Sequence, residues 1–512
     1  MGTAVNYIIL GLYIIGMILI TYITKNKSKS VNDFLLAGKG LNGWMTAFAY
    51  GTTYFSSVIF IGYAGKLGWS YGLSVIWIGI GNALIGSLLA WKVLAKRTRN
   101  MTRRLSAKTM PEFFEKRYDS RKIKLVSSII IFIFLIPYSA SVYQGLSYLF
   151  EEVFGINFVL CVLLLACLTA LYLFFGGYFA TALSDFIQGI IMLAGVCIMV
   201  FSVLNYQAIN WGEGFTKLIN NHLGIFPSST AGTPFIYDKP VTLISLVLLT
   251  SLGVWALPQT IHKFYAVRDK KAIGQATIVS TIFAMIIGVG AYLTGSFGSI
   301  FFSGSLPSGG VDTIMPIMLS NILLPGFIGL IAVLVLSASM STLSSVALSG
   351  SSVIAVDVYK GFIKKDAADN KINLVMRIFC LVFIAISVLL AIFPIDAIVT
   401  MMGISWGTLA GCFIGPFVLG LISKKITRTA AWTSIISGLV ITITLILVFG
   451  FDRGTGTLGN ALQTGVKYSP TIGVITMIWS LIITPIVSIF TKKPEKETIF
   501  NSFEAPLEDE II

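Results

Sequence analysis

Hydroxyl side chains are unusually dense in one apolar part of the chain, where nine of the sixteen residues from 337 to 352 are Ser or Thr. On a helix, residues that recur at intervals of three and four share one face. Here they are Ala338, Ser341, Thr342 and Ser345, with Ser344 beside them. A row of neutral oxygens suits a small hard cation that is held weakly enough to be released. Close helix packing, with each hydroxyl bonded to its own helix, produces the same pattern, so the stripe alone leaves both interpretations open.

Two charged residues also fall inside apolar stretches. Asp185 lies in a predicted membrane span, where a charge is costly and therefore indicates a role such as cation or proton binding. An acid near a helix terminus is alternatively stabilised by the helix dipole and by water at the interface. Lys66 either extends its ammonium to the outer interface or attracts a substrate carboxylate into an outer vestibule.

The composition requires membrane helices to position these residues. The 512-residue chain is 56% hydrophobic and 11% charged, and its mean hydropathy is +0.88. Apolar runs of about 20 residues cross a hydrocarbon core of roughly 30 Å, and helices satisfy the backbone there. The sequence predicts an all-α integral membrane protein with thirteen transmembrane helices. They are expected near residues 4–24, 43–70, 73–95, 124–150, 156–176, 179–204, 241–262, 272–296, 326–356, 373–393, 396–422, 429–449 and 470–490.

The net charge of +14 is distributed in a way that argues against a nucleic-acid partner, because 30 of the 36 Lys and Arg residues fall in six predicted loops. These loops are residues 25–43, 96–124, 263–271, 360–377, 424–428 and 492–496. Such an excess marks cytoplasmic loops. We therefore expect the N-terminus outside, the C-terminus inside, and a multi-pass protein of the plasma membrane whose surroundings are the lipid bilayer.

The second and seventh predicted helices, 43–70 and 241–262, point in opposite directions, and both are interrupted. The second contains Gly51, Gly62, Gly65 and Gly68, and the seventh contains Gly253 and Pro258. Matching broken helices at the start of two oppositely oriented halves are typical of secondary transporters, whose binding site lies between the halves. The core is thus expected to be a 5+5 inverted repeat of helices 2–6 and 7–11.

The sequence does not indicate an enzyme. Its five Cys and two His residues have no metal-ligand or disulfide-like grouping, and it contains no phosphate-binding loop or nucleophile elbow. An ion channel could use the hydroxyl stripe to line a pore, but repeated filter elements are absent and the inverted halves favour a transporter.

Five segments, in order along the chain, resemble the sodium:solute symporter family, whose members include the bacterial proline and pantothenate permeases. They are FLLAGKGLNGW at 34–44, SSVIFIGYAG at 56–65, MPEFFEKRYDSRKIK at 110–124, FGGYFATALSDFIQG at 175–189 and ASMSTLSSVALSGSSVIAVDVYK at 338–360. The resemblance covers nearly the whole chain. It implies a leucine-transporter-like fold, sodium as the coupling ion and a small-molecule substrate.

The resemblance also implies ligands for sodium. A first ion would be held by the backbone carbonyls of Thr52, Phe55 and Ala338 and by the hydroxyls of Ser341 and Thr342. An unwound helix 2 would supply such carbonyls. A second ion, as in the sialic acid transporters of the family, would use Asp185 with Ser341, Thr342, Ser344 and Ser345.

For the substrate, the resemblance points to a wall formed by three helices. Its residues are Ser56, Ser57 and Ile59 of helix 2, Tyr138 and Gln144 of helix 4, and Thr250, Val254, Trp255 and Gln259 of helix 7. Tyr138 is similar to a tyrosine near the substrate of proline permease. This chain has Tyr54 where that permease has an acidic residue, and Thr250 and Val254 where it has aromatic residues, which weakens a proline assignment.

The sequence therefore predicts a sodium-coupled secondary active symporter that imports a small polar solute, such as an amino acid, pantothenate or a monocarboxylate. A proton-coupled symporter with Asp185 as the proton carrier is the closest alternative. The protein is expected to act as a monomer, and its charged tail to lack fixed structure. The expected divisions are 1–40 with helix 1 and a basic loop, 41–204 with the first repeat, 205–239 as an extracellular loop, 240–423 with the second repeat, 424–492 with helices 12 and 13, and 493–512 as the tail.

Overall fold

The computed structural model describes residues 2–24, 31, 35, 40–207, 209–221, 223–229, 238–452 and 457–507. Within these ranges the chain is helical apart from its connections and one isolated β-bridge. Eleven helical segments of the described chain are long and apolar enough to cross a membrane. An all-α membrane fold is thereby confirmed, while the count of thirteen helices stays a prediction. Parts of the predicted segments 25–43, 205–239 and 493–512 lie outside the described residues.

The α-helices follow one another with short connections. They are α1 (Gly2–Thr24), α3 (Gly43–Tyr54), α4 (Ala64–Tyr71), α5 (Ile76–Gly81), α6 (Lys96–Arg104), α7 (Met110–Tyr118), α8 (Arg121–Phe154), α9 (Phe158–Leu204), α10 (Trp211–Asn220), α11 (Lys239–Leu252), α12 (Pro258–Ala266), α13 (Lys270–Ser296), α14 (Gly298–Phe301), α15 (Ile314–Ile322), α16 (Phe327–Ser352), α17 (Asp369–Ile392), α18 (Ile398–Ile414), α19 (Gly420–Ile422), α20 (Arg428–Asp452), α21 (Leu458–Gly465), α22 (Ser469–Phe490) and α23 (Lys496–Ile499). Shorter 3-10 and π-helical turns extend them: η3 (Val58–Tyr63), η4 (Gly72–Val75), η5 (Asn82–Leu89), η6 (Trp91–Ala95), η8 (Gly253–Ala256), η9 (Val311–Thr313), η10 (Val353–Ile363), η11 (Gly415–Leu419), η12 (Val466–Tyr468) and η13 (Phe500–Glu504).

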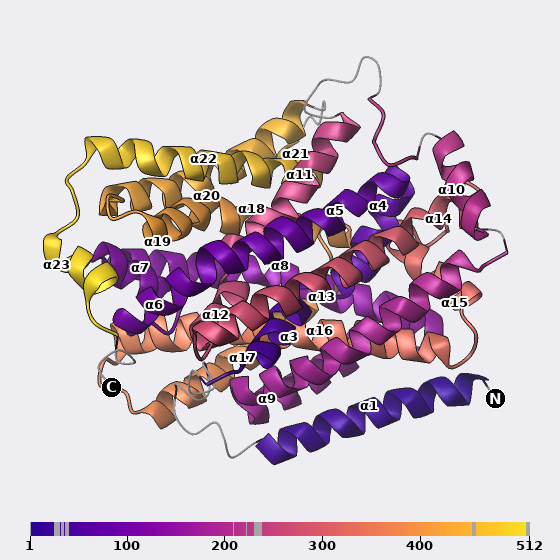
Figure 1. Cartoon of the computed structure of the whole chain (residues 1–512), viewed down its shortest axis with the longest axis horizontal. Coiled ribbons are helices and arrows are strands. Elements are labelled where there is room, and N and C mark those ends of the chain that lie inside the picture. The colour runs from indigo at the N-terminus through magenta and orange to yellow at the C-terminus, as the bar shows by residue number, and fades with distance from the viewer. Residues whose placement is uncertain are drawn as a thin grey trace.

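The helices are arranged around a buried centre that contains α16 and α18. In their most apolar windows, 89% of the residues of the α16 span and 94% of those of the α18 span are buried, against 17% for α1. In Figure 1, α1 runs along one edge of the bundle, and α20 and α22 run along the opposite edge. The outer helices expose large apolar side chains such as Leu12, Ile18 and Val440. An apolar outer surface is what a lipid environment requires, because lipid tails solvate it as well as a protein core does.

Local sequence signals set the helix ends around the centre. The Asn42 side chain accepts a hydrogen bond from Met45 N and caps α3, and the Asp269 side chain accepts one from Ala272 N and caps α13. Both caps satisfy amides that lack an intrahelical partner. Pro258 occupies the first turn of α12, where its missing N–H costs nothing.

Both predicted interruptions are present. The second helix is divided into α3, η3 and α4 by Phe55, which is extended with φ −106° and ψ 114°. The seventh is divided into α11, η8 and α12, with Leu257 extended at φ −83° and ψ 122°. The two helices also meet at their ends on one side, where Leu41 before α3 and Val267 after α12 form the isolated β-bridge.

The long α9 contains the predicted helices 156–176 and 179–204. Thr169 donates a hydrogen bond to Met340 Sδ, while Gly195 lies against Leu334. On a straight helix, residues 169 and 195 would be about 39 Å apart, whereas Leu334 and Met340 lie within two turns of each other on α16. The α9 segment is therefore not a straight rod beside α16, and its division into two crossings stays a prediction.

The start of α1 and helix α23 lie at opposite ends of the bundle (Figure 1), as an odd number of crossings requires. Which end faces the cytoplasm stays a prediction. The expectation of a tail without fixed structure is wrong for residues 496–504, which form α23 and η13. Arg104 Nε donates to the Ala505 carbonyl at 2.7 Å, and Ser502 is fully buried. α6 thus supplies a charged donor to the backbone just after this described segment.

Candidate functional site

The break at Phe55 is fully buried in the bundle. Phe55 N still donates to the Gly51 carbonyl at 3.0 Å, and Ile59 N donates to the Ser56 carbonyl at 3.0 Å. Regular helix therefore ends at Tyr54 and resumes after Ser57. Carbonyls at such an end lack intrahelical partners and become available to side chains or ions.

Hydroxyls of α16 contact the carbonyl end of α3. Thr342 Oγ1 is 3.3 Å from the carbonyl oxygens of both Thr52 and Thr53, and it donates to them. Ser341 Oγ donates to Thr52 Oγ1 at 2.8 Å. All four side chains are at most 1% exposed. Three of the five residues predicted for a first sodium ion are therefore in direct contact.

The other two predicted first-site residues lie next to this contact along the chain. Phe55 is the extended residue at the break, and Ala338 precedes Thr342 by one turn of α16; both are fully buried. Every oxygen named for this site is a neutral carbonyl or hydroxyl. Such an oxygen set can hold a monovalent cation without trapping it.

Two of the residues predicted for a second ion, Asp185 and Ser345, contact a basic side chain that was expected in a cytoplasmic loop. Lys263 lies on α12 and is 1% exposed. Its Nζ donates to Ser345 Oγ at 2.9 Å and is 3.6 Å from Asp185 Oδ2. Ser344 instead donates to the Ser341 carbonyl of its own helix at 2.9 Å. The sequence offered no signal for Lys263 beyond its charge, because the residue ends an apolar run and precedes a basic loop.

The substrate-wall residues of helices 2 and 4 are close together. Ser57 Oγ donates to the Val142 carbonyl at 2.8 Å, and the Tyr138 hydroxyl lies beside the side chains of Ser56 and Thr342. Tyr138 thus connects the predicted substrate wall to the predicted sodium site. Ile59 is buried in the turn that follows the break. Gln144 donates to the Ala391 carbonyl at 3.5 Å, toward α17, and its Oε1 has no hydrogen-bond partner among the described residues.

The substrate-wall residues predicted on the seventh helix do not all face the same neighbours. Thr250 contacts the centre, because its carbonyl accepts the Tyr54 hydroxyl at 2.6 Å. Trp255 is half-buried and donates its indole N–H to the Ile85 carbonyl at 3.0 Å. Its ring edge therefore faces η5 and not the substrate wall. Val254 and Gln259 are both 1% exposed, and Gln259 Oε1 has no hydrogen-bond partner in the described part of the chain.

An aromatic group that the sequence analysis missed lies beside Tyr138. The Trp406 ring of α18 is 5.4 Å from the Tyr138 ring and 6.2 Å from the Tyr54 ring, measured between centroids. Trp406 is 1% exposed, and its indole N–H has no partner among the described residues. A buried donor without a partner is costly unless water or a ligand satisfies it. No sequence pattern separates Trp406 from the other membrane tryptophans.

Lys66 lies on α4 and is half-buried. Its charge acts on Asp312, which accepts a hydrogen bond from Ile398 N at 3.2 Å. An acidic neighbour thus partly balances this ammonium, which was expected either to reach the outer interface or to attract a substrate carboxylate.

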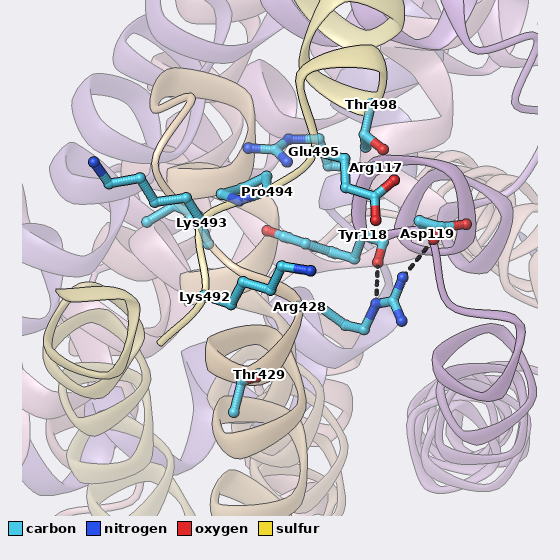
Figure 2. Close-up of a pocket in the computed structure, with 11 residues that line it drawn as sticks. Arg117, Tyr118, Asp119, Arg428, Thr429, Lys492, Lys493, Pro494, Glu495 and Thr498 are labelled. Atoms are coloured by element: carbon cyan, nitrogen blue, oxygen red, sulfur yellow. Dashed lines mark hydrogen bonds and ion pairs between the residues drawn. The ribbon is translucent and has the colours of Figure 1, made fainter. Parts of the chain in front are cut away.

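A surface pocket of about 230 Å³ lies far from this site, at the end of the bundle that carries α7 and α23. Figure 2 shows its basic lining of Arg117, Arg428, Lys492 and Lys493. Arg428 donates to the Tyr118 carbonyl at 2.9 Å and forms an ion pair with Asp119. These contacts join α7 to α20 and fasten the end of the bundle.

The model of the sodium:solute symporter family matches residues 34–438. The osmoregulated proline transporter OpuE of Bacillus subtilis is 31% identical over 95% of each chain. A sodium/proline symporter of Staphylococcus aureus is 27% identical over 96% of each chain. These relatives match along nearly the whole length, so the similarity includes both interrupted helices and α16.

Solved structures with the same fold have lower identity. A Na+-coupled sialic acid symporter in its substrate-bound outward-open state has a TM-score of 0.79 at 21% identity, over 96% of this chain and 99% of that chain. Mhp1, a nucleobase-cation-symport-1 family transporter in a closed conformation, has a TM-score of 0.50 at 13% identity over 92% and 97%. Both are leucine-transporter-like, so the comparison shows that fold for this chain.

Proposed function

Because the chain belongs to the sodium:solute symporter family, we propose that it imports a small polar organic solute together with sodium by alternating access. Membership supports Na+-coupled symport, and the matched relatives are transporters rather than enzymes. The transporter resides in the plasma membrane, as its bacterial relatives imply, and acts as a monomer.

The contact between Thr342 and the end of α3 carries the sodium part of this proposal. The Thr342 hydroxyl lies between two carbonyls at 3.3 Å and thus occupies the position from which its oxygen could share an ion with them. Sodium would bind Thr52, Phe55 and Ala338 through carbonyls and Ser341 and Thr342 through hydroxyls.

Sodium at this position would couple its gradient to the shape of the protein. An ion bound by both α3 and α16 pulls the two helices together, so it favours whichever state keeps them in contact. Each sodium that crosses 100 mV contributes about 2.3 kcal/mol. That energy would drive the solute uphill.

The solute is proposed to be a small compound with a carboxylate, such as an amino acid, pantothenate or a monocarboxylate. The site lies near Ser56, Ser57, Tyr138 and Thr250, and it has the unpaired Trp406 donor as a candidate contact. L-proline is the first solute to test, because the two relatives are named as a proline transporter and a sodium/proline symporter. Tyr54 stands where proline permease has an acidic residue, and its hydroxyl donates to the Thr250 carbonyl. An amino acid other than proline is therefore also an expected outcome of the solute test.

The test is a thermal-shift screen of purified protein with amino acids, pantothenate and short monocarboxylates, each in NaCl and in choline chloride. Compounds that stabilise the protein only with sodium then enter uptake assays in proteoliposomes. We expect concentrative uptake with an inward sodium gradient and none when choline replaces sodium at fixed pH. Uptake that persists in choline and follows a proton gradient would instead establish proton coupling.

A further inference from the structure

Lys263 occupies the cluster in which a second cation was predicted. It comes from α12, the half-helix after the second break, and reaches α16 and the second half of α9. Its ammonium donates to Ser345 Oγ at 2.9 Å and lies 3.6 Å from the Asp185 carboxylate. The side chains of both Lys263 and Asp185 are 1% exposed.

The cluster has one negative charge and one positive charge. Neither Asp185 oxygen has a regular hydrogen bond within the described part of the chain, although the Ser341 and Lys263 side chains both lie beside the carboxyl. Of these two neighbours only the ammonium carries a charge that compensates the carboxylate. Ser345 also links this cluster to the first predicted site. Its hydroxyl is 3.0 Å from Thr53 Oγ1, and the Thr53 carbonyl accepts a hydrogen bond from Thr342. A buried carboxylate needs a cation in contact with it, and here the chain supplies one.

We propose that the Lys263 ammonium is a tethered cation in the place of a second sodium ion, so that the protein binds one sodium per cycle. This inference rests on the proposed function, since it concerns the number of coupling ions. A sodium ion added beside the ammonium would lie within about 4 Å of a like charge in a medium of low dielectric, where repulsion is strong. A lysine cannot leave with the solute, so this cation contributes no driving force.

The decisive variant is Lys263→Met, which has a similar length and no charge. In it, Asp185, Ser345 and Thr53 would face each other without a cation, and a sodium ion could take the vacated position. The matched control is Lys263→Arg, which keeps the charge. A double variant, Lys263→Met with Asp185→Asn, removes the carboxylate that would hold the new ion.

The measurement is the number of 22Na+ ions bound per chain at saturation, with purified protein and sodium alone. We expect one for the wild type and for Lys263→Arg, two for Lys263→Met and one for the double variant. The Hill coefficient of sodium binding should rise from about 1 toward 2 only in Lys263→Met. Two ions in the wild type, or one in a folded Lys263→Met, would overturn the proposal.

The wild-type count tests the proposal even if Lys263→Met fails to fold, because two ions cannot be reconciled with a lysine in the second site. Failure of the proposed function has a different signature. A wild type that binds no sodium and takes up solute equally in choline would exclude sodium coupling, whereas a wild type with two bound ions would keep sodium coupling and exclude only the tethered cation.

Discussion

Two polar clusters lie one turn apart on α16 and use the same residue types, yet their chemistry differs. At Ser341 and Thr342 the hydrogen-bond partners on α3 are Thr52 and the carbonyl end of the helix, all neutral, and of these two side chains Ser341 also lies beside the Asp185 carboxyl. At Ser345 the neighbours are Lys263 and, beyond it, Asp185. The first cluster is suited to an exchangeable ion, and the second already contains a fixed one. A hydroxyl stripe therefore does not define an ion site; the helices packed against it do.

The sharpest way to test the charged cluster is Asp185→Asn, which leaves the Lys263 ammonium buried without its carboxylate. Removing one partner of a buried ion pair costs about 3–5 kcal/mol, so we expect a clear fall in melting temperature or loss of folded protein. The measurement is thermal unfolding of purified protein in detergent. Adding Lys263→Met should recover much of the loss. A single variant as stable as the wild type would mean that the pair contributes no charge compensation.

The neutral cluster should respond in sodium binding rather than in stability. Thr342→Ala removes a hydroxyl proposed to bind the ion, and a hydrogen bond or ligand contact to a charged group contributes about 1.5–3 kcal/mol. We expect the half-saturating sodium concentration to rise about 10–100-fold, as measured by sodium-dependent uptake or 22Na+ binding. Thr342→Ser, which keeps the hydroxyl, is the matched control. Unchanged sodium dependence in Thr342→Ala would contradict the ligand assignment.

Tyr138 connects the neutral cluster to the substrate wall, so Tyr138→Phe tests whether the two are coupled. The change removes only the hydroxyl beside Ser56 and Thr342, and one hydrogen bond is worth about 0.5–1.5 kcal/mol. We expect a shift of about two- to tenfold in apparent solute affinity, with a smaller shift in sodium affinity. Uptake kinetics at saturating and at limiting sodium give the two apparent affinities separately. A larger change in sodium affinity than in solute affinity would indicate that Tyr138 belongs to the ion site.

Asp269 provides the exposed counterpart of Asp185. It lies in the connection after α12, and its pKa is lowered chiefly by the hydrogen bond from Ala272 N and also by Arg268. Because its pKa is lower in the folded protein, its stabilising effect is present above the pKa of an unfolded aspartate and is lost as the pH falls through the folded pKa. Asp269→Asn should therefore change the melting temperature by a degree or so at pH 7 and less in acid, since Asn is also a good cap. If Asp269→Asn lowered the melting temperature as much as Asp185→Asn does, burial would not explain the different effects of the two acids on stability.

Much of the fold follows from local patterns in the sequence. Long apolar runs forced helices, and Gly253 with Pro258 marked an interruption that the structure has at Leu257. The Ser and Thr spacing placed Ser341 and Thr342 on one face of α16, and the family resemblance implied the contact with α3 that this face makes. The substrate wall was less predictable. Trp255 belongs to the right helix, but its indole N–H donates to Ile85, and nothing local distinguishes Trp406.

The sequence by itself determined that this chain crosses a membrane as helices, that two of them break, and that one carries a row of hydroxyls. Those properties depend on neighbours along the chain, through helix periodicity and through the backbone's need for hydrogen bonds. Only the tertiary structure decided which hydroxyls face carbonyls and which face a lysine. Lys263 and Ser345 are 82 positions apart, and the charge at the second cluster arises from packing α12 against α16 and α9, which no local pattern encodes.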